Sequence, residues 1–97
     1  MSSRMVLGLL ELDLMIRGAR SLKDKRRAVK SYKDRIRARF NVSIAEVSDH
    51  ELYQRAGLAV ACVGTDVAFV QSVLQRVANQ VAYVRDLELI DQSIEIL

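Results

Sequence analysis

Residues 5–40 read MVLGLLELDLMI, then RGAR, then SLKDKRRAVKSYKDRIRARF, and this stretch decides the fold. In its first block, residues 10–14 alternate apolar and acidic side chains, which is the period of two expected for a strand with one buried face. In its last block, Ser21 stands three residues before Asp24, an arrangement that caps a helix and places an anion in its first turn. The stretch therefore predicts a strand over Met5–Ile16 followed by a helix.

The predicted helix carries one apolar stripe. Five of its apolar residues fall within about 80° of one another on a wheel that turns about 100° per residue. They are Leu22, Val29, Tyr32, Ile36 and Phe40. A stripe of this kind faces a sheet, so we expect the helix to end near Phe40 and to pack on the strands.

The rest of the chain predicts three more strands and a second helix. β-Branched and alternating residues indicate strands, and a Thr-Asp cap followed by apolar residues at helical spacing indicates the helix. The expected elements are a strand at Asn41–Val47, a strand at Gly57–Val63, a helix from about Asp66 to about Ala82, and a strand at Leu87–Leu97 with a bulge near Leu89–Ile90. The polar segment Ser48–Ala56 is expected to be a loop or one helical turn.

This β-α-β-β-α-β order predicts an α+β, ferredoxin-like fold, in which a four-stranded antiparallel sheet carries two helices on one face. Right-handed crossovers place the first and third strands in the centre. We expect one domain over residues 1–97. Its predicted shared core is Leu12, Val29, Ile36, Val60, Leu74 and Val77. Because the chain has no proline, its glycines (Gly8, Gly18, Gly57 and Gly64) are expected to mark the ends of elements.

Composition narrows the function further. With 97 residues, 51% hydrophobic and 28% charged, the chain resembles an ordinary small globular domain that has little room for a deep enclosed site. The lone Cys62 and the lone His50 argue against a disulfide, a metal site and a cofactor; we expect Cys62 in the core and His50 in a surface loop. No apolar run approaches the roughly 20 residues of a membrane span, so a reduced, soluble, cytoplasmic protein without a membrane partner is expected.

The charges are strongly segregated along the chain. Residues 17–39 hold eleven basic and two acidic residues, a net charge of +9, whereas the remaining residues hold four basic and ten acidic ones, a net charge of −6. Such an asymmetry indicates a polyanionic partner. Five cations recur at helical spacing of three and four residues, and a row about 20 Å long can follow successive phosphates. The candidate nucleic-acid-binding residues are Lys23, Arg26, Arg27, Lys30, Lys33 and Arg37, extended by Arg17 and Arg20.

Two other sites are disfavoured by the residues. The predicted third strand has no aromatic side chain for stacking on bases, and Glu11 and Asp13 are expected on an open, acidic sheet face that repels RNA. An acylphosphatase-like activity would require a glycine-rich loop after the first strand with an arginine and an asparagine beside it. That loop, residues 16–20, holds one glycine, and Asn41 is the candidate amide. We therefore expect no enzymatic activity.

Four segments together resemble the YlxP-like family of small bacterial proteins. They are SLKDKRR at residues 21–27, RFNVSIAEV at residues 39–47, YQRA at residues 53–56 and IEIL at residues 94–97. The resemblance covers nearly the whole chain and implies a ferredoxin-like fold. Genes of that family are often found between those for translation initiation factor 2 and ribosome-binding factor A, which implies by association work on RNA or the ribosome.

The function expected from charge and resemblance together is that of a non-catalytic accessory protein that binds RNA, with ribosomal RNA as the candidate. The alternative is a homo-oligomeric interaction module, in its simplest form a homodimer, or a small-ligand regulatory module without nucleic-acid binding. The small residues Ala59 and Ala61 in the third strand, which would allow close approach of a second copy, support that alternative.

Overall fold

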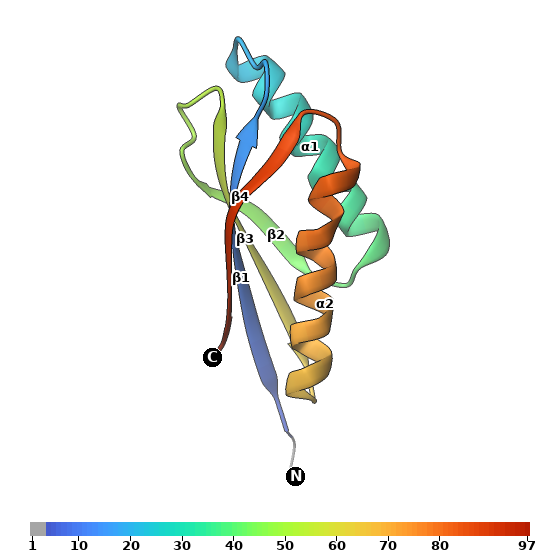
Figure 1. Ribbon diagram of the computed structural model, residues 1–97. Helices are drawn as coiled ribbons and strands as arrows, with labels where there is room; N and C mark the ends of the chain where they lie inside the picture. The colour runs from blue at the N-terminus through green and yellow to red at the C-terminus, as the bar shows by residue number, and fades with distance from the viewer. Residues whose placement is uncertain (1–3) are drawn as a thin grey trace.

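A computed structural model describes residues 4–97 (Figure 1). Its elements are β1 (Val6–Ile16), α1 (Leu22–Arg39), β2 (Ser43–Ser48), β3 (Arg55–Gly64), α2 (Val67–Asn79), the short 3-10 helix η1 (Gln80–Tyr83) and β4 (Leu87–Ile96). The order of strands across the sheet is β2-β3-β1-β4, and every neighbouring pair is antiparallel. The predicted ferredoxin-like fold is confirmed, with β1 and β3 in the centre and both helices on one face of the sheet (Figure 1).

The alternation along β1 separates the two faces of the sheet. Leu10, Leu12 and Leu14 point toward the helices and are buried, whereas Glu11 between them is exposed. The stripe of α1 meets these leucines through Val29, Tyr32 and Ile36, and α2 contributes Val70, Leu74 and Val77. All six residues of the predicted core are buried. The packed interface between sheet and helices therefore positions α1 with its remaining faces toward solvent.

Both predicted helix caps are present. Ser21 accepts a hydrogen bond from the backbone N–H of Asp24 at 3.1 Å, and Asp66 accepts one from Phe69 at 2.9 Å. These bonds satisfy donors that have no partner inside the helix. Gly18 lies in the turn before α1 with φ of +71°, a conformation that glycine adopts without steric cost.

Two of the glycines do not mark the ends of elements. Gly8 lies inside β1 on the helix side, and a Cβ placed there would be 2.5 Å from Val70 Cγ1 of α2. Gly57 lies inside β3, where a Cβ would collide with the Ser48 side chain on β2. The prediction was wrong at these two positions because each glycine admits a close neighbour from a distant part of the chain.

The bulge predicted in β4 is confirmed. Asp13 of β1 pairs with Asp91 and the next residue, Leu14, pairs with Leu89, so Ile90 is the extra residue on β4. The bulge changes which side chains face solvent, and Ile90 becomes exposed. After the bulge, partly buried and exposed side chains alternate again along β4, and Ile94 and Ile96 pack against the core.

Element ends differ from prediction by a few residues. α2 ends at Asn79, and the tighter helix η1 begins at Gln80 and places Val81 in the core. β3 begins at Arg55, two residues early, so the turn between β2 and β3 is shorter than the predicted segment Ser48–Ala56. As expected, Cys62 is buried and His50 is exposed. Within residues 4–97, no helix is long and apolar enough to cross a membrane.

Candidate nucleic-acid interface

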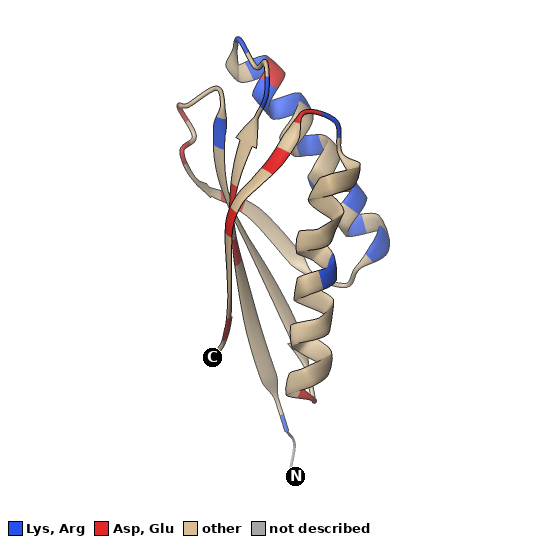
Figure 2. Ribbon diagram, in the orientation of Figure 1, with Lys and Arg blue, Asp and Glu red and all other residues tan. Residues whose placement is uncertain are grey.

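Five of the eight candidate residues form a row on α1. Their spacing places them on one flank of the helix, beside the buried stripe. They are Lys23, Arg26, Lys30, Lys33 and Arg37, here called the cation row. Arg37 Nη2 donates a hydrogen bond to the carbonyl oxygen of Ile44 at 3.2 Å, so this flank faces β2. Figure 2 shows the basic residues following α1 along its length.

Most of the charge in the cation row is uncompensated. Lys30 pairs with the exposed Asp34 one turn later, and the hydrogen bond from Lys30 lowers the pKa of that carboxyl. Arg37 is held by a neutral carbonyl, which leaves its charge in place. Across residues 4–97, Lys23, Arg26 and Lys33 make no ion pair and no side-chain hydrogen bond. The row therefore presents three cations, Lys23, Arg26 and Lys33, that an anionic ligand meets without first displacing a partner.

The other three candidates lie at the N-terminal end of α1. Arg17 follows β1 and pairs with Glu88 at 3.2 Å. The backbone N–H of Arg20 donates to the carboxylate of Asp24, which fixes the start of the helix. Arg27 and Arg17 line a cavity of about 300 Å³ between α1 and the turn that leads into β4. The structure therefore separates the candidates into the cation row and a second group at the N-terminal end of α1, of which Arg17 and Arg27 line this cavity.

Two basic residues of the same stretch have structural roles. Lys25 is 2% exposed; its Nζ donates to the carbonyl oxygen of Asp49 and lies 2.9 Å from Glu46 Oε2. The Glu46 contact is an ion pair without hydrogen-bond geometry. Arg35 donates to Gln80 and lies with its guanidinium 5.3 Å from the centre of the Tyr83 ring. Both side chains hold α1 in place, and the buried Lys25 is unavailable to a ligand.

One basic residue near the second group was missed by the sequence. Arg85, in the turn between η1 and β4, lines the same cavity as Arg17 and Arg27. Nothing around residue 85 distinguishes it in the sequence, because it belongs to no periodic pattern. The antiparallel pairing of β4 with β1 brings it to this end of the molecule.

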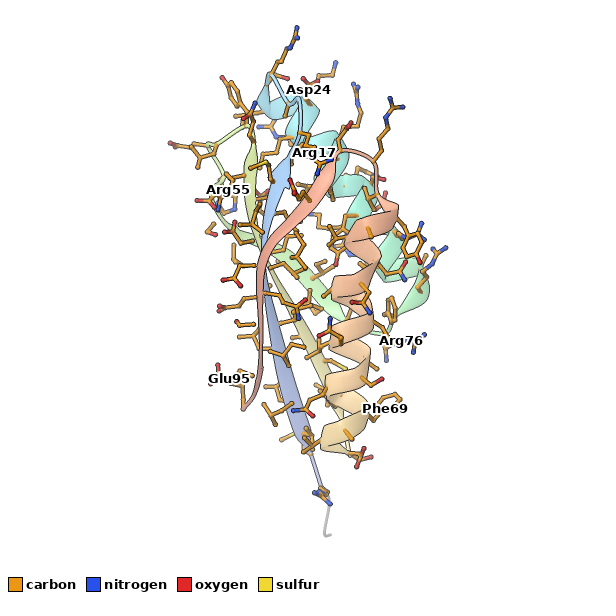
Figure 3. The ribbon with its side chains drawn as sticks, viewed as in Figure 1. Arg17, Asp24, Arg55, Phe69, Arg76 and Glu95 are labelled. Carbon is orange, nitrogen blue, oxygen red and sulfur yellow. The ribbon has the colours of Figure 1, made fainter. Side chains whose placement is uncertain are left out.

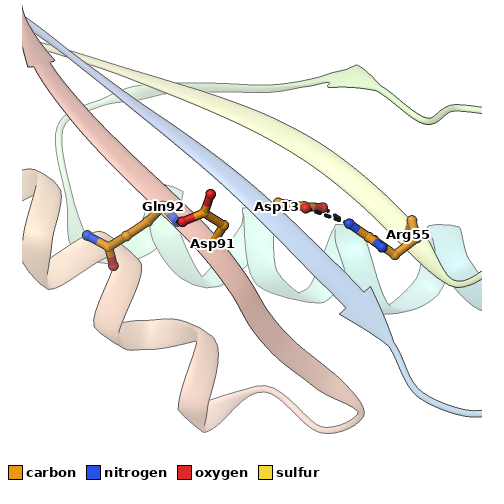
Figure 4. Close-up of polar contacts among 4 residues, drawn as sticks. All are labelled: Asp13, Arg55, Asp91 and Gln92. Atoms are coloured by element: carbon orange, nitrogen blue, oxygen red, sulfur yellow. Dashed lines mark hydrogen bonds and ion pairs between the residues drawn. The ribbon is translucent and has the colours of Figure 1, made fainter.

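The open face of the sheet is acidic, as expected. Glu11, Asp13 and Asp91 line a cavity of about 480 Å³ on neighbouring strands, joined by Asp49 from the turn after β2. Asp13 pairs with Arg55, and Asp91 accepts a hydrogen bond from the backbone of Gln92 (Figure 4). No group of three or more His, Cys, Asp or Glu in residues 4–97 has the geometry of a metal site. This face would repel a polyanion.

The remaining amide candidate is misplaced for phosphate chemistry. Asn41 follows the C-terminal end of α1, whose 18 residues extend about 27 Å at 1.5 Å per residue from the loop after β1. The amide beside that loop is Gln54, whose Nε2 donates to the carbonyl oxygen of Ala19 at 3.2 Å. The described residues thus bring no asparagine to residues 16–20.

The sequence matches a known protein family over most of its length. A family described as "Protein of unknown function (DUF503)" matches residues 7–94. The chain belongs to the DUF503 family. It is 35% identical over 72 residues to the protein described as "Uncharacterized protein YlxP" of Bacillus subtilis (strain 168). The matched region covers 74% of this chain and 78% of that protein. The resemblance to the YlxP-like family is confirmed, and neither description gives a catalytic activity.

Solved structures agree on the fold of this DUF503 chain. A C-terminal segment of the alpha subunit of aIF2 from Pyrococcus abyssi matches 99% of the chain with a TM-score of 0.52 at 12% identity. The chain spans 51% of that archaeal segment. The de novo designed protein Foldit4 matches 97% of the chain and 94% of its own length, with a TM-score of 0.50 at 12% identity. At this identity the likeness shows the fold alone.

Proposed function

We propose that this DUF503 protein is a non-catalytic accessory protein that binds the phosphate backbone of structured RNA through the cation row of α1. The observation that carries the proposal is the combination of helical spacing and missing counter-charges. Four of the five cations in the row have no acidic partner within residues 4–97, and Lys30 alone is paired with a carboxylate. Cations spaced along about 20 Å match successive phosphates and release counterions when they bind.

The proposed partner is ribosomal RNA in the cytoplasm, which the resemblance to the YlxP-like family suggests. Contacts with phosphates position a protein on RNA without reading its sequence. The cation row therefore provides affinity and orientation, whereas recognition of one RNA site requires contacts with bases. The acidic open face of the sheet would point away from the RNA, because α1 covers the opposite face.

Binding of a labelled ribosomal stem-loop, measured by fluorescence anisotropy near physiological salt, tests the proposal. The double variant Arg26→Gln with Lys33→Gln removes two unpaired cations and keeps good helix formers, so it should bind about tenfold or more weakly. The matched control, Arg4→Gln with Arg55→Gln, removes the same number of charges outside α1, because Arg55 pairs with Asp13 on the open face of the sheet. It should bind nearly as tightly as the parent. Equal weakening in both variants would show that only net charge matters and would contradict the proposal.

Self-association is the second candidate. The open sheet face becomes apolar beyond Glu11, where Leu9 lies beside Ala61 and Leu7 beside the exposed Val63. An exposed apolar surface of this kind could be covered by a second copy of the chain. Sedimentation equilibrium decides this candidate: a dimer mass that becomes a monomer mass in Val63→Asp supports it, and a monomer mass at about 100 µM excludes a dimer of micromolar affinity. Such a dimer would leave α1 free for RNA.

A further inference from the structure

The cavity at the N-terminal end of α1 is built by two tight turns. One turn holds Gly18 with φ of +71° and the other holds Asp86 with φ of +70°. The backbone N–H of Arg17 donates to the carbonyl oxygen of Asp86 at 2.8 Å, so the two turns are fixed side by side. Residues 24–31 of α1 close the third side. We call this cavity the turn pocket; Figure 3 labels Arg17 and Asp24 at this end of the molecule.

The wall of the turn pocket carries both signs of charge. Arg17, Arg27 and Arg85 line it together with Asp24 and Asp86. Arg17 is paired with Glu88, and Asp24 accepts the backbone N–H of Arg20. Arg27, Arg85 and the carboxylate of Asp86 make no ion pair or side-chain hydrogen bond within residues 4–97. The pocket therefore offers two unpaired guanidinium groups and one unpaired carboxylate.

This combination does not suit a simple anion. A free phosphate would gain from the arginines but would be repelled by the carboxylate. The pocket suits a ligand that carries both an anionic group and N–H donors. A nucleotide has both, because its phosphate accepts hydrogen bonds from guanidinium groups and the edge of its base donates to a carboxylate.

The size and lining of the turn pocket agree with one nucleotide. Its volume of about 300 Å³ is at the lower end of the range for small-molecule sites. Ile16, Ala19, Ala28 and Val84 also line the pocket, and their apolar atoms form a floor that the face of a base could contact. The hydroxyl of Ser31 adds one more polar group. A base still paired and stacked in a duplex could not enter, so the ligand is an unpaired nucleotide.

We propose that the turn pocket binds one unpaired nucleotide of the RNA, with the phosphate at Arg27 and Arg85 and the edge of the base at Asp86. This inference rests on the proposed function and adds a contact with a base to it. The cation row would follow the backbone of a stem, and the turn pocket would take a nucleotide from an adjoining loop or bulge. The carboxylate favours bases that present two neighbouring N–H donors, as guanine does.

Titration of the ¹⁵N-labelled protein with guanosine 5′-monophosphate, uridine 5′-monophosphate and inorganic phosphate, followed by NMR, tests the pocket without RNA. Guanosine monophosphate should shift the amide signals of Gly18, Ser31, Arg85 and Asp86 and should bind more tightly than the other two probes. Arg27→Gln with Arg85→Gln should weaken it about tenfold or more, because two charge-assisted contacts are lost. Asp86→Asn, which tolerates the same backbone conformation, should remove the preference for guanosine over uridine.

The double variant in the cation row, Arg26→Gln with Lys33→Gln, is the matched control because it loses the same charge. It should bind guanosine monophosphate like the parent. No shifts at the pocket up to about 10 mM nucleotide, or equal binding of inorganic phosphate, would overturn the turn pocket. Neither result would affect the cation row, whose own test uses stem-loop RNA. Conversely, if Arg26→Gln with Lys33→Gln bound stem-loop RNA like the parent, the proposed function would be overturned. The titration with mononucleotides would still show whether the turn pocket binds a nucleotide.

Discussion

Tyr32 connects the two helices through the core. Its side chain is fully buried, and its hydroxyl donates to the carbonyl oxygen of Val77 in α2 at 2.7 Å. Tyr32→Phe keeps the ring and removes the hydroxyl, so unfolding in urea should show a loss of about 0.5–1.5 kcal/mol. Tyr83→Phe, at an exposed ring, should leave the free energy of unfolding unchanged. An equal loss in both variants would show that the buried hydrogen bond contributes nothing.

The same hydroxyl makes stability depend on alkaline pH. Burial raises the pKa of Tyr32 well above its ordinary value of about 10. A raised pKa in the folded state stabilises the fold fully below pH 10, and this contribution decreases as pH rises further, because the unfolded chain releases the proton first. The stability difference between the parent and Tyr32→Phe should therefore decrease above pH 10. Parallel stability curves between pH 8 and 11 would contradict this assignment.

Gly8 sets how closely α2 approaches the sheet. A Cβ at this position would lie 2.5 Å from Val70 Cγ1 and 2.8 Å from Leu74 Cδ1. Gly8→Ala should therefore destabilise the protein by about 1–3 kcal/mol through overpacking. Adding Val70→Ala should recover part of that loss, and the two changes should be non-additive in thermal unfolding. Strict additivity would mean that the helix moves away without cost. The sequence could not reveal this role, because Val70 is distant along the chain.

At the scale of elements, Lys25 joins α1 to the end of β2. Its ammonium group is buried against Glu46 and the carbonyl oxygen of Asp49. Lys25→Met leaves the carboxylate of Glu46 without its partner and should cost about 2–4 kcal/mol. The double variant Lys25→Met with Glu46→Gln should be more stable than Lys25→Met alone, as measured by chemical denaturation. A double variant that is no more stable would show that lost packing of the lysine stem, and not the ion pair, dominates.

The elements differ in how far the sequence predicts them. β1 and α1 follow from local alternation, capping and the apolar stripe, and the structure confirms both. The end of α2 does not follow from local pattern, because Val81 continues the helical spacing although it is buried from a 3-10 turn. The early start of β3 depends on its pairing with β1, in which Met15 lies opposite Arg55. Such long-range contacts override the local signals.

For the whole molecule, the charge segregation of the sequence becomes a segregation in space. The basic residues follow α1 on one side of the sheet, and acidic residues lie on the opposite face and in the turns (Figure 2). The cation row could be predicted, because its spacing of three and four residues lies within one helix. The turn pocket could not, because it requires Arg27 of α1 to meet Arg85 of the distant turn before β4. The sequence also could not distinguish the free cations from Lys25 and Arg35, whose partners are distant in the chain.

The salt dependence of RNA binding reports how many phosphates the cation row contacts. If the cation row contacts about four phosphates of a ribosomal stem, a plot of log affinity against log salt concentration should have a slope of about −3.6, at about 0.9 counterions released per contact with a duplex. Arg26→Gln with Lys33→Gln removes two contacts, so its slope should be shallower by about 1.8. Asp91→Asn with Glu95→Gln, on the acidic face, should leave the slope of the parent unchanged. A parent slope shallower than about −1, or one shared by the parent and the row variant, would contradict the account.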